Sequence, residues 1–256
     1  MFLEIAPLEG GSSLGGARPK AHVRESDGRL GIAKFPSPNG DEWDIVRWEA
    51  VALTLAKNAG VVVPPFKLHV VADKPVLIVR RFDRKENERI GYVSAMTMLE
   101  ASDGDHGSYL EIAEAVEEHS PSAEADLHQL WRRIVFSRLI SDTDDHLRNH
   151  GFLRTSTAGW SLSPAFDMNP NPKPAGKHFS TAIDEGRDGE KEIALALEVA
   201  GRFRLSDEQA RIILDEVATA TAGWVEAASA SGLPAGEVKR MSAAFESEQA
   251  HSPDRR

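Results

Sequence analysis

The sequence contains no cysteine. Disulfides, thiolate metal sites and cysteine nucleophiles are therefore all excluded. The absence fits a reducing compartment, where disulfides do not persist. Any catalytic site has to be built from other side chains.

Long hydrophobic runs and an excess of positive charge are also missing. No apolar segment approaches the roughly 18 to 20 residues that cross a bilayer, and residues 1–10 lack the positive start and apolar middle of a signal peptide. We therefore expect a cytoplasmic protein without a membrane partner. The formal net charge of -10 argues against direct nucleic-acid binding by this chain alone, because a phosphate backbone would be repelled.

The chain is long enough for a large core. Its 256 residues, 41% of them hydrophobic and 27% charged, predict a globular protein of two lobes or two small domains. Residues 1–85 read as a small β-rich N-lobe. This lobe has a glycine-rich loop at Gly10–Gly16 and one helix over 41–58, which Gly60 ends. Its strands are expected at 20–24, 30–35, 66–71 and 76–79.

Residues 86–247 read as a helical C-lobe, and residues 248–256 as a polar, disordered tail. Two short strands around Phe152 and Trp160 interrupt the helices. The pattern Ser206-Asp-Glu-Gln209 is a capping box at the start of one helix. The helices are expected at 109–118, 126–141, 190–200, 206–224 and 235–245. The fold class is therefore α+β.

The most informative motif is Asp144-Asp-His-Leu-Arg-Asn149, followed by Asp167. Protein kinases use an Asp to position the acceptor hydroxyl, an Asn five residues later for a metal, and a further Asp for the second metal. Asp142 and Asp145 compete for the first role, but the spacing to Asn149 favours Asp144. His146 is a metal ligand or a loop hydrogen-bonding group, and Arg148 balances local charge or meets a substrate phosphate.

Several N-lobe residues fit a nucleotide site. The glycine-rich loop with Arg18 and Lys20 can bring backbone N–H groups to an anion, although a flexible terminus has the same composition. Lys34 lies in an apolar strand, where it either reaches ATP phosphates or extends from an edge strand to solvent. Glu49 either pairs with Lys34 or is an exposed helix residue. The stretch Arg80–Arg84 ends the last strand, where an adenine could meet backbone donors and acceptors.

Over residues 9–225 the sequence resembles the HipA-like serine/threonine kinases of bacterial toxin–antitoxin systems. The resemblance rests on several motifs in a fixed order, which are Ser12-Ser-Leu-Gly-Gly-Ala-Arg-Pro-Lys20, Ala33-Lys-Phe, Glu49 with Leu53-Thr-Leu-Ala-Lys57, Arg81-Phe-Asp-Arg84, Asp103-Gly-Asp-His-Gly-Ser-Tyr109, Asp142-Thr-Asp-Asp-His-Leu-Arg-Asn149 and Pro164-Ala-Phe-Asp167. It implies a bilobal protein-kinase-like fold and a kinase that uses ATP and Mg²⁺.

The resemblance also implies individual roles. Asp144 is the catalytic residue, Asn149 and Asp167 hold magnesium, and Lys34 holds ATP phosphates. Backbone groups near Arg80 and Phe82 contact adenine. The phosphate loop contributes Gly15, Gly16 and Ser13; Ser13 is the autophosphorylation site, with Ser12 as the alternative. A phosphate there adds about two negative charges to a loop that must accept ATP, so self-inhibition is expected.

The partners implied are a helix-turn-helix antitoxin and a protein substrate such as an aminoacyl-tRNA synthetase. Relatives of full length carry an N-terminal subdomain before the phosphate loop, which here begins near residue 10. Either a separate chain supplies that subdomain, or this reading frame is shortened. Two other functions remain open, a small-molecule phosphotransferase of the aminoglycoside or choline kinase type and a catalytically weak pseudokinase that only binds. The retained Lys34, Asp144, Asn149 and Asp167 argue against the second.

Overall fold

The computed structural model of the protein describes residues 18–85, 88–102, 104–105, 107–173, 178–187 and 192–249. The predicted phosphate loop, with Ser12, Ser13, Gly15 and Gly16, lies outside these residues, as does most of the predicted C-terminal tail. Within the described ranges, no helix combines the length and the apolar character that crossing a membrane requires.

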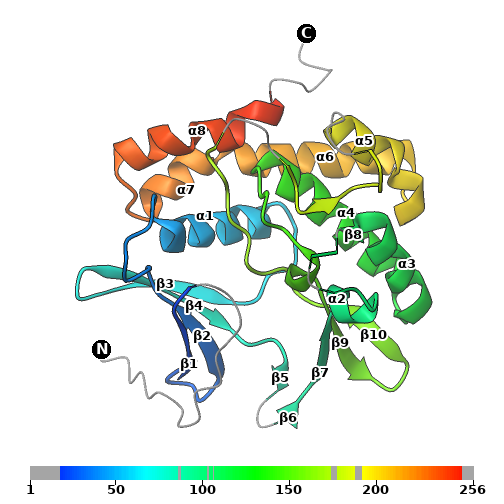
Figure 1. The fold of residues 1–256 in the computed structure, drawn as a ribbon, viewed down its shortest axis with the longest axis horizontal. Helices are drawn as coiled ribbons and strands as arrows, with labels where there is room; N and C mark the ends of the chain where they lie inside the picture. Colours follow the sequence, from blue (N-terminus) through cyan, green and yellow to red (C-terminus); the bar gives the residue numbers. More distant parts are fainter. Residues whose placement is uncertain are drawn as a thin grey trace.

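The N-lobe is built on a four-stranded antiparallel sheet with the order β1-β2-β4-β3 (Figure 1). Its strands are β1 (Lys20–Arg24), β2 (Leu30–Lys34), β3 (Phe66–Val71) and β4 (Lys74–Arg80). Ala72 and Asp73 both have positive φ, as a tight turn between β3 and β4 requires. All four strands agree with the predicted positions to within two residues.

Helix α1 (Ile45–Asn58) connects this sheet to the rest of the molecule. It begins later than predicted because the side chain of Asp44 caps it by accepting a hydrogen bond from the N–H of Arg47 at 3.0 Å. One side of α1 packs on β3 and β4, and it also contacts helices α6 (Asp207–Ala222) and α7 (Trp224–Ala230). A helix in contact with both lobes makes them one structural unit.

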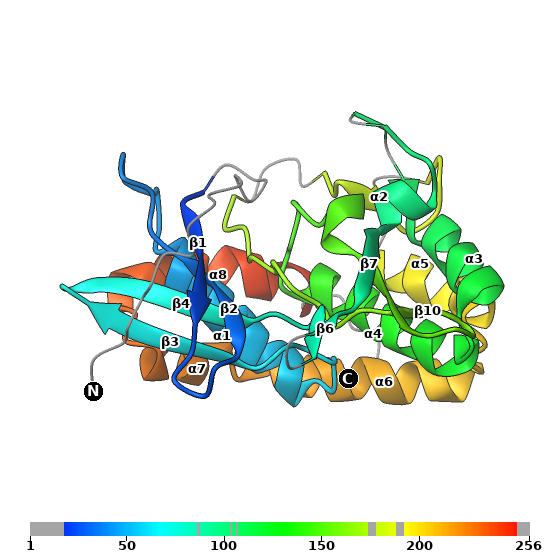
Figure 2. The same ribbon diagram turned by 90° about the horizontal axis from the view of Figure 1, so that it is seen from below.

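A second sheet, with the order β10-β9-β7, lies beside the first (Figure 2). Its strands are β7 (Gly91–Ser94), β9 (Gly151–Ser156) and β10 (Gly159–Leu162). A short hairpin of β5 (Arg84–Lys85) and β6 (Glu88–Arg89) precedes it, so the predicted lobe boundary at residue 85 falls inside a paired hairpin.

Helices form the remainder of the C-lobe, with α4 (Ala123–Leu139) at its centre. The predicted capping box at Ser206 is present: Ser206 Oγ accepts from the N–H of Gln209, and Gln209 Oε1 accepts from the N–H of Ser206. The other elements are α2 (Ala95–Met98), β8 (Gly107–Ser108), α3 (Tyr109–His119), η1 (Leu147–Asn149), β11 (Thr181–Ala182), α5 (Glu192–Glu198), η2 (Ala200–Phe203) and α8 (Ala235–Gln249).

An apolar core runs through both lobes, and a smaller cluster of Val23, Ala33, Val76 and Ile78 lies within the N-lobe sheet. The core through both lobes includes Trp48 of α1, which is fully buried against Trp224 and Phe245 at ring-centroid distances of 6.3 and 6.2 Å. The rings of Trp224 and Phe245 stack at 4.8 Å. The N-lobe helix is therefore fixed by C-terminal aromatic residues.

Candidate active site

Three charged side chains from distant parts of the chain meet where the two lobes face each other. Lys34 Nζ, at the end of β2, donates to Glu49 Oε1 at 2.5 Å and to Asp167 Oδ1 at 2.7 Å. Glu49 comes from α1, and Asp167 follows β10. The pairing of Lys34 with Glu49, which the sequence left open against an exposed Glu49, is present. We refer to these three residues as the ion triad.

Two members of the ion triad, Lys34 and Glu49, are largely removed from water, whereas the side chain of Asp167 is 38% exposed. The side chain of Glu49 is 4% exposed and that of Lys34 is 17% exposed. Burial disfavours the charged form of Lys34, but the carboxylates of Glu49 and Asp167 outweigh it and raise the pKa of the amine. Burial likewise opposes ionisation of Asp167, yet Lys34 lowers the pKa of that carboxyl. For Glu49, burial is the stronger effect and raises the pKa.

Asp167 has an unusual backbone conformation. Its φ of 60° lies in the left-handed region, which Asp adopts more readily than most residues because its short side chain can bond locally. The preceding Phe166 packs on Phe82 at a ring-centroid distance of 5.5 Å. The left-handed turn therefore lets Phe166 and Asp167 line the same space from adjacent positions.

An apolar cavity of about 230 Å³ lies on one side of the ion triad. Phe82 and Tyr92 pack on each other at 6.1 Å, and burial raises the pKa of the Tyr92 hydroxyl to about 12. Strands β2 and β4 and helix α1 supply the aliphatic wall. The apolar lining residues are Ile32, Leu53, Val79, Phe82, Tyr92 and Phe166. Such a mostly apolar space suits a heteroaromatic ring.

A second and more polar cavity of about 440 Å³, which we call the polar cavity, lies on the other side. The three residues of the ion triad line both cavities, so they stand at the junction between an apolar and a polar compartment. Arg18 lines the polar cavity but is paired with Asp41 at 2.5 Å. The other polar residues that line this cavity are Lys20, Thr143, Asp144, His146, Asn169 and Asn171.

Asp144 lies in residues 141–149, a segment that we name the catalytic loop after the role predicted from the sequence. Asp144 is exposed and lines the polar cavity together with Asp167. Both competing carboxyls are buried, since Asp142 is 1% exposed and Asp145 is 8% exposed. Asp145 is held by Tyr109 and His150. Of the three acids, Asp144 is the one that can meet a substrate in this cavity.

Asn149 is buried at the end of η1, and its Nδ2 donates to the backbone oxygen of Asp144 at 3.3 Å. It is not among the residues that line the polar cavity. The structure therefore brings Asp144 and Asp167 to one cavity and connects Asn149 to it through the Asp144 backbone. His146 lines the cavity and accepts a backbone hydrogen bond from Asn149, while Arg148 is exposed.

The donor set is compatible with magnesium but not with a metal enclosed by protein. In the described part of the chain, no three His, Asp or Glu side chains gather closely enough to hold a metal ion. Mg²⁺ commonly keeps several waters and takes only one or two protein carboxylates together with substrate phosphates. Asp167, whose side chain is 38% exposed, is an oxygen donor of that kind and lines the polar cavity. The Asn149 amide has the same donor chemistry but lies outside the cavity lining.

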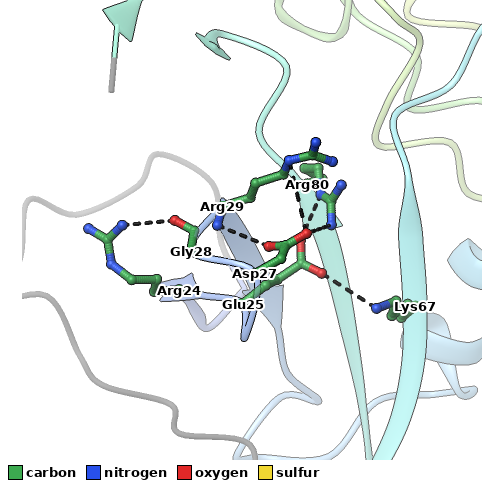
Figure 3. A network of polar contacts seen from close by, with 7 residues as sticks. All are labelled: Arg24, Glu25, Asp27, Gly28, Arg29, Lys67 and Arg80. Carbon is green, nitrogen blue, oxygen red and sulfur yellow. Dashed lines mark hydrogen bonds and ion pairs between the residues drawn. The ribbon is translucent and has the colours of Figure 1, made fainter. Parts of the chain in front are cut away.

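Arg80 lines the apolar cavity, but its side chain is engaged in ion pairs at the surface. Its Nε donates to Glu25 Oε1 at 2.8 Å and its Nη2 to Asp27 Oδ2 at 2.9 Å, in a surface network at the β1–β2 turn (Figure 3). The N–H of Arg80 bonds Pro65 O and that of Arg81 bonds Leu30 O, so these two backbone donors are already used. Phe82, in contrast, places its ring in the apolar cavity wall.

Sequence reasoning missed Tyr92 and Phe166 of the cavity wall and Tyr109 beneath the catalytic loop. A local signal existed for Phe166, which directly precedes Asp167. For Tyr92 the sequence signal is weaker and consists of a glycine at position 151. A Cβ at that position would lie 2.3 Å from Tyr92 Cε2, so the ring packs where only glycine leaves room. That signal requires knowledge of the β7–β9 register, which pairs Ser94 with Gly151.

Comparison with known proteins agrees with this architecture. A family model described as the HipA-like C-terminal domain matches residues 12–225. The chain is 23% identical over 189 residues to a Haemophilus influenzae protein named "Putative kinase", covering 65% of this chain and 55% of that protein. It is 26% identical over 159 residues to "Putative kinase Y4dM" of Sinorhizobium fredii, covering 56% of this chain and 38% of the relative. The chain thus spans about half the length of these curated relatives, or less.

Two solved structures share the fold. One belongs to the Shewanella oneidensis MR-1 toxin–antitoxin complex of HipA, HipB and operator DNA, with a TM-score of 0.70, 17% identity, and coverage of 98% of this chain and 66% of the other. The second is the Helicobacter pylori proinflammatory kinase CtkA, with a TM-score of 0.56, 17% identity, and coverage of 90% and 96%. The class is therefore that of kinase-like folds, with a β-rich and a helical lobe. Because the family model covers most of the chain, the protein belongs to the HipA-like C-terminal domain family.

Proposed function

We propose that the protein transfers the γ-phosphoryl group of ATP to a serine or threonine hydroxyl of a protein, with magnesium. The position of the ion triad between an apolar and a polar cavity carries the proposal. A nucleotide has the same division, with a flat base at one end and a charged triphosphate at the other. Asp144 lies in the polar cavity, where the terminal phosphate would be.

Each residue of the site has a proposed role that follows from its position. Phe82, Tyr92 and Phe166 would enclose the adenine, and Lys34, whose raised pKa keeps it charged at neutral pH, would hold phosphate oxygens. Asp144 would accept a hydrogen bond from the acceptor hydroxyl and orient it in line with the phosphoryl group. Asp167 and Asn149 would hold magnesium, which supplies charge neutralisation of the phosphates when bound.

Membership of the HipA-like family extends this proposal to a role in the cell. The chain would act in the cytoplasm as the toxin of a toxin–antitoxin pair and phosphorylate a translation component such as an aminoacyl-tRNA synthetase. The structural likeness to the HipA–HipB–DNA complex supports a helix-turn-helix antitoxin as partner. Autophosphorylation at Ser13, or at Ser12, would block the nucleotide site.

Labelled ATP and Mg²⁺ test the proposal directly. Purified protein is incubated alone and in a cell lysate, and modified residues are identified by mass spectrometry. Asp144→Asn is expected to lower the transfer rate by about 100-fold or more while the protein stays folded. Asp215→Asn, at an exposed position on α6, is the matched control and should transfer at the wild-type rate.

An undiminished rate in Asp144→Asn removes the role of that residue. Transfer to an aminoglycoside or choline, without labelled protein, would identify a small-molecule phosphotransferase instead. Nucleotide binding without any turnover would identify a pseudokinase.

A further inference from the structure

The stretch Gly107-Ser-Tyr109 belongs to a motif with no role in the site described so far. Ser108 caps α3 in a capping box, because its Oγ accepts from the N–H of Glu111 and its own N–H donates to Glu111 Oε2 at 2.7 Å. This arrangement fixes Tyr109 as the first residue of α3. Its side chain is completely buried.

Tyr109 holds the residue next to Asp144. Its hydroxyl donates to Asp145 Oδ2, and His150 Nε2 lies 3.0 Å from Asp145 Oδ1. The Tyr109 ring meets the His150 ring edge to face at 5.2 Å, and Arg138 lies over it at 5.3 Å from the ring centroid. Burial would favour the neutral acid, but His150, Tyr109 and Arg138 hold the pKa of Asp145 at about 2. Asp145 is therefore a charged anchor and not a candidate base.

Gly107 packs against the same loop. A Cβ at this position would lie 2.7 Å from both terminal methyl groups of Leu147, so η1 packs directly on the glycine. Strand β8 also pairs in parallel with β11, matching Thr181 to Gly107.

The β11 side holds the other neighbour of Asp144. Ser180, next to β11, donates its N–H and its Oγ to Thr143 O at 3.0 and 2.9 Å. Asn171 Nδ2 donates to Thr143 Oγ1 at 2.8 Å. Both neighbours of the exposed Asp144 are thus fixed, Thr143 by residues 171 and 180 and Asp145 by Tyr109 and His150.

We propose that Gly107-Ser-Tyr109 is a positioning platform for the catalytic loop and that the Tyr109 hydroxyl sets the position of Asp144 through Asp145. The proposal rests on the kinase function proposed above. Tyr109 is buried and touches neither cavity, so it acts through another residue. Its loss should affect the orientation of the acceptor hydroxyl but not the binding of nucleotide.

Tyr109→Phe tests this role because it removes one hydroxyl and keeps the ring that His150 and Arg138 contact. We expect kcat for Mg-ATP turnover, measured as ADP release and as labelled phosphate on protein, to fall by about 10-fold or more, since small displacements of a reacting group cost rate steeply. KM for ATP should stay at the wild-type value. Amide hydrogen exchange should rise in residues 143–150 and remain unchanged in β2 and β4.

Ser206→Ala is the control for lost stability. This variant removes the cap of α6 at a distance from the site. It should keep the wild-type kcat even if its melting temperature falls by as much as that of Tyr109→Phe. An unchanged kcat in Tyr109→Phe, or a rise in KM for ATP with kcat intact, overturns the platform. Absence of turnover in the wild type refutes the kinase proposal instead. The platform is then judged on hydrogen exchange alone, where unchanged exchange at 143–150 refutes it.

Discussion

Removal of Lys34 should separate the structural from the chemical role of the ion triad. In Lys34→Met, two carboxylates that share one amine face each other in a site where Glu49 is 4% exposed. Removing one partner of a buried ion pair costs about 3 to 5 kcal/mol, because the remaining charge is uncompensated. Asp167 is 38% exposed, so solvent screens part of this cost and we expect the lower end, about 3 kcal/mol.

The double variant Lys34→Met/Glu49→Gln provides the sharper test. It removes one of the two facing charges, so it should be more stable than Lys34→Met alone even though it carries one more substitution. Since burial raises the pKa of Glu49, Glu49→Gln by itself should cost little stability. Phosphoryl transfer should be absent in the double variant, because the amine that holds the phosphates is missing. The double variant would therefore regain stability without regaining phosphoryl transfer.

Thermal unfolding monitored by circular dichroism measures these differences. About 3 kcal/mol corresponds to a fall in Tm of about 6 to 12 °C for a domain of this size. The pH dependence has a defined sign. Without Lys34, the pKa values of Glu49 and Asp167 rise in the folded state, so stability is present at low pH and is lost as the pH rises through those raised values. The deficit of Lys34→Met should therefore shrink in acid.

Lys74→Met is the matched control, since Lys74 is exposed at the start of β4 and should tolerate the change. A double variant less stable than Lys34→Met would refute the reasoning, because it would mean that Glu49 stabilises the fold independently of the lysine.

Two further outcomes concern the nucleotide site. Arg80→Ala should leave KM for ATP close to the wild-type value, because this side chain is bound to Glu25 and Asp27; a large rise in KM would restore it as a nucleotide-binding residue. Gly151→Ala should destabilise the protein by about 1 to 3 kcal/mol and raise KM for ATP, since the new methyl group displaces the Tyr92 ring from the cavity wall. Gly201→Ala, where a Cβ meets open space, is its control, and equal KM values in both would contradict the role of Tyr92.

The sequence predicted those elements whose signals are local. The four N-lobe strands and the Ser206 cap follow from alternation and from capping chemistry, and the structure contains them. Short elements were missed, among them α2, α7 and β8, because segments of two to seven residues have too few positions to show a period. β8 depends entirely on its partner β11, which lies more than seventy residues later.

The candidate site likewise combines features with a local sequence signal and features that depend on distant residues. Asp144 and Asp167, which the sequence singled out by their order and spacing, line one cavity, although no spacing could show that Asn149 is connected to it only through a backbone oxygen. Arg80, placed near adenine because it ends a strand, lines the apolar cavity. Its position in the sequence could not show that Glu25 and Asp27 of the β1–β2 turn bind its side chain.

The position of Glu49 depends on parts of the chain beyond the lobe that contains it. Glu49 follows Trp48 on α1, and Trp48 packs against Trp224 of α7 and Phe245 of α8, whose rings stack on each other. Glu237 of α8 also accepts a hydrogen bond from the N–H of Asp44, the residue that caps α1, at 3.1 Å. Helix α8 lies past residue 225, where the match to the family model ends. Since α1 cannot move away from Lys34 without separating these aromatic rings, the C-terminal helix is part of what keeps the ion triad assembled.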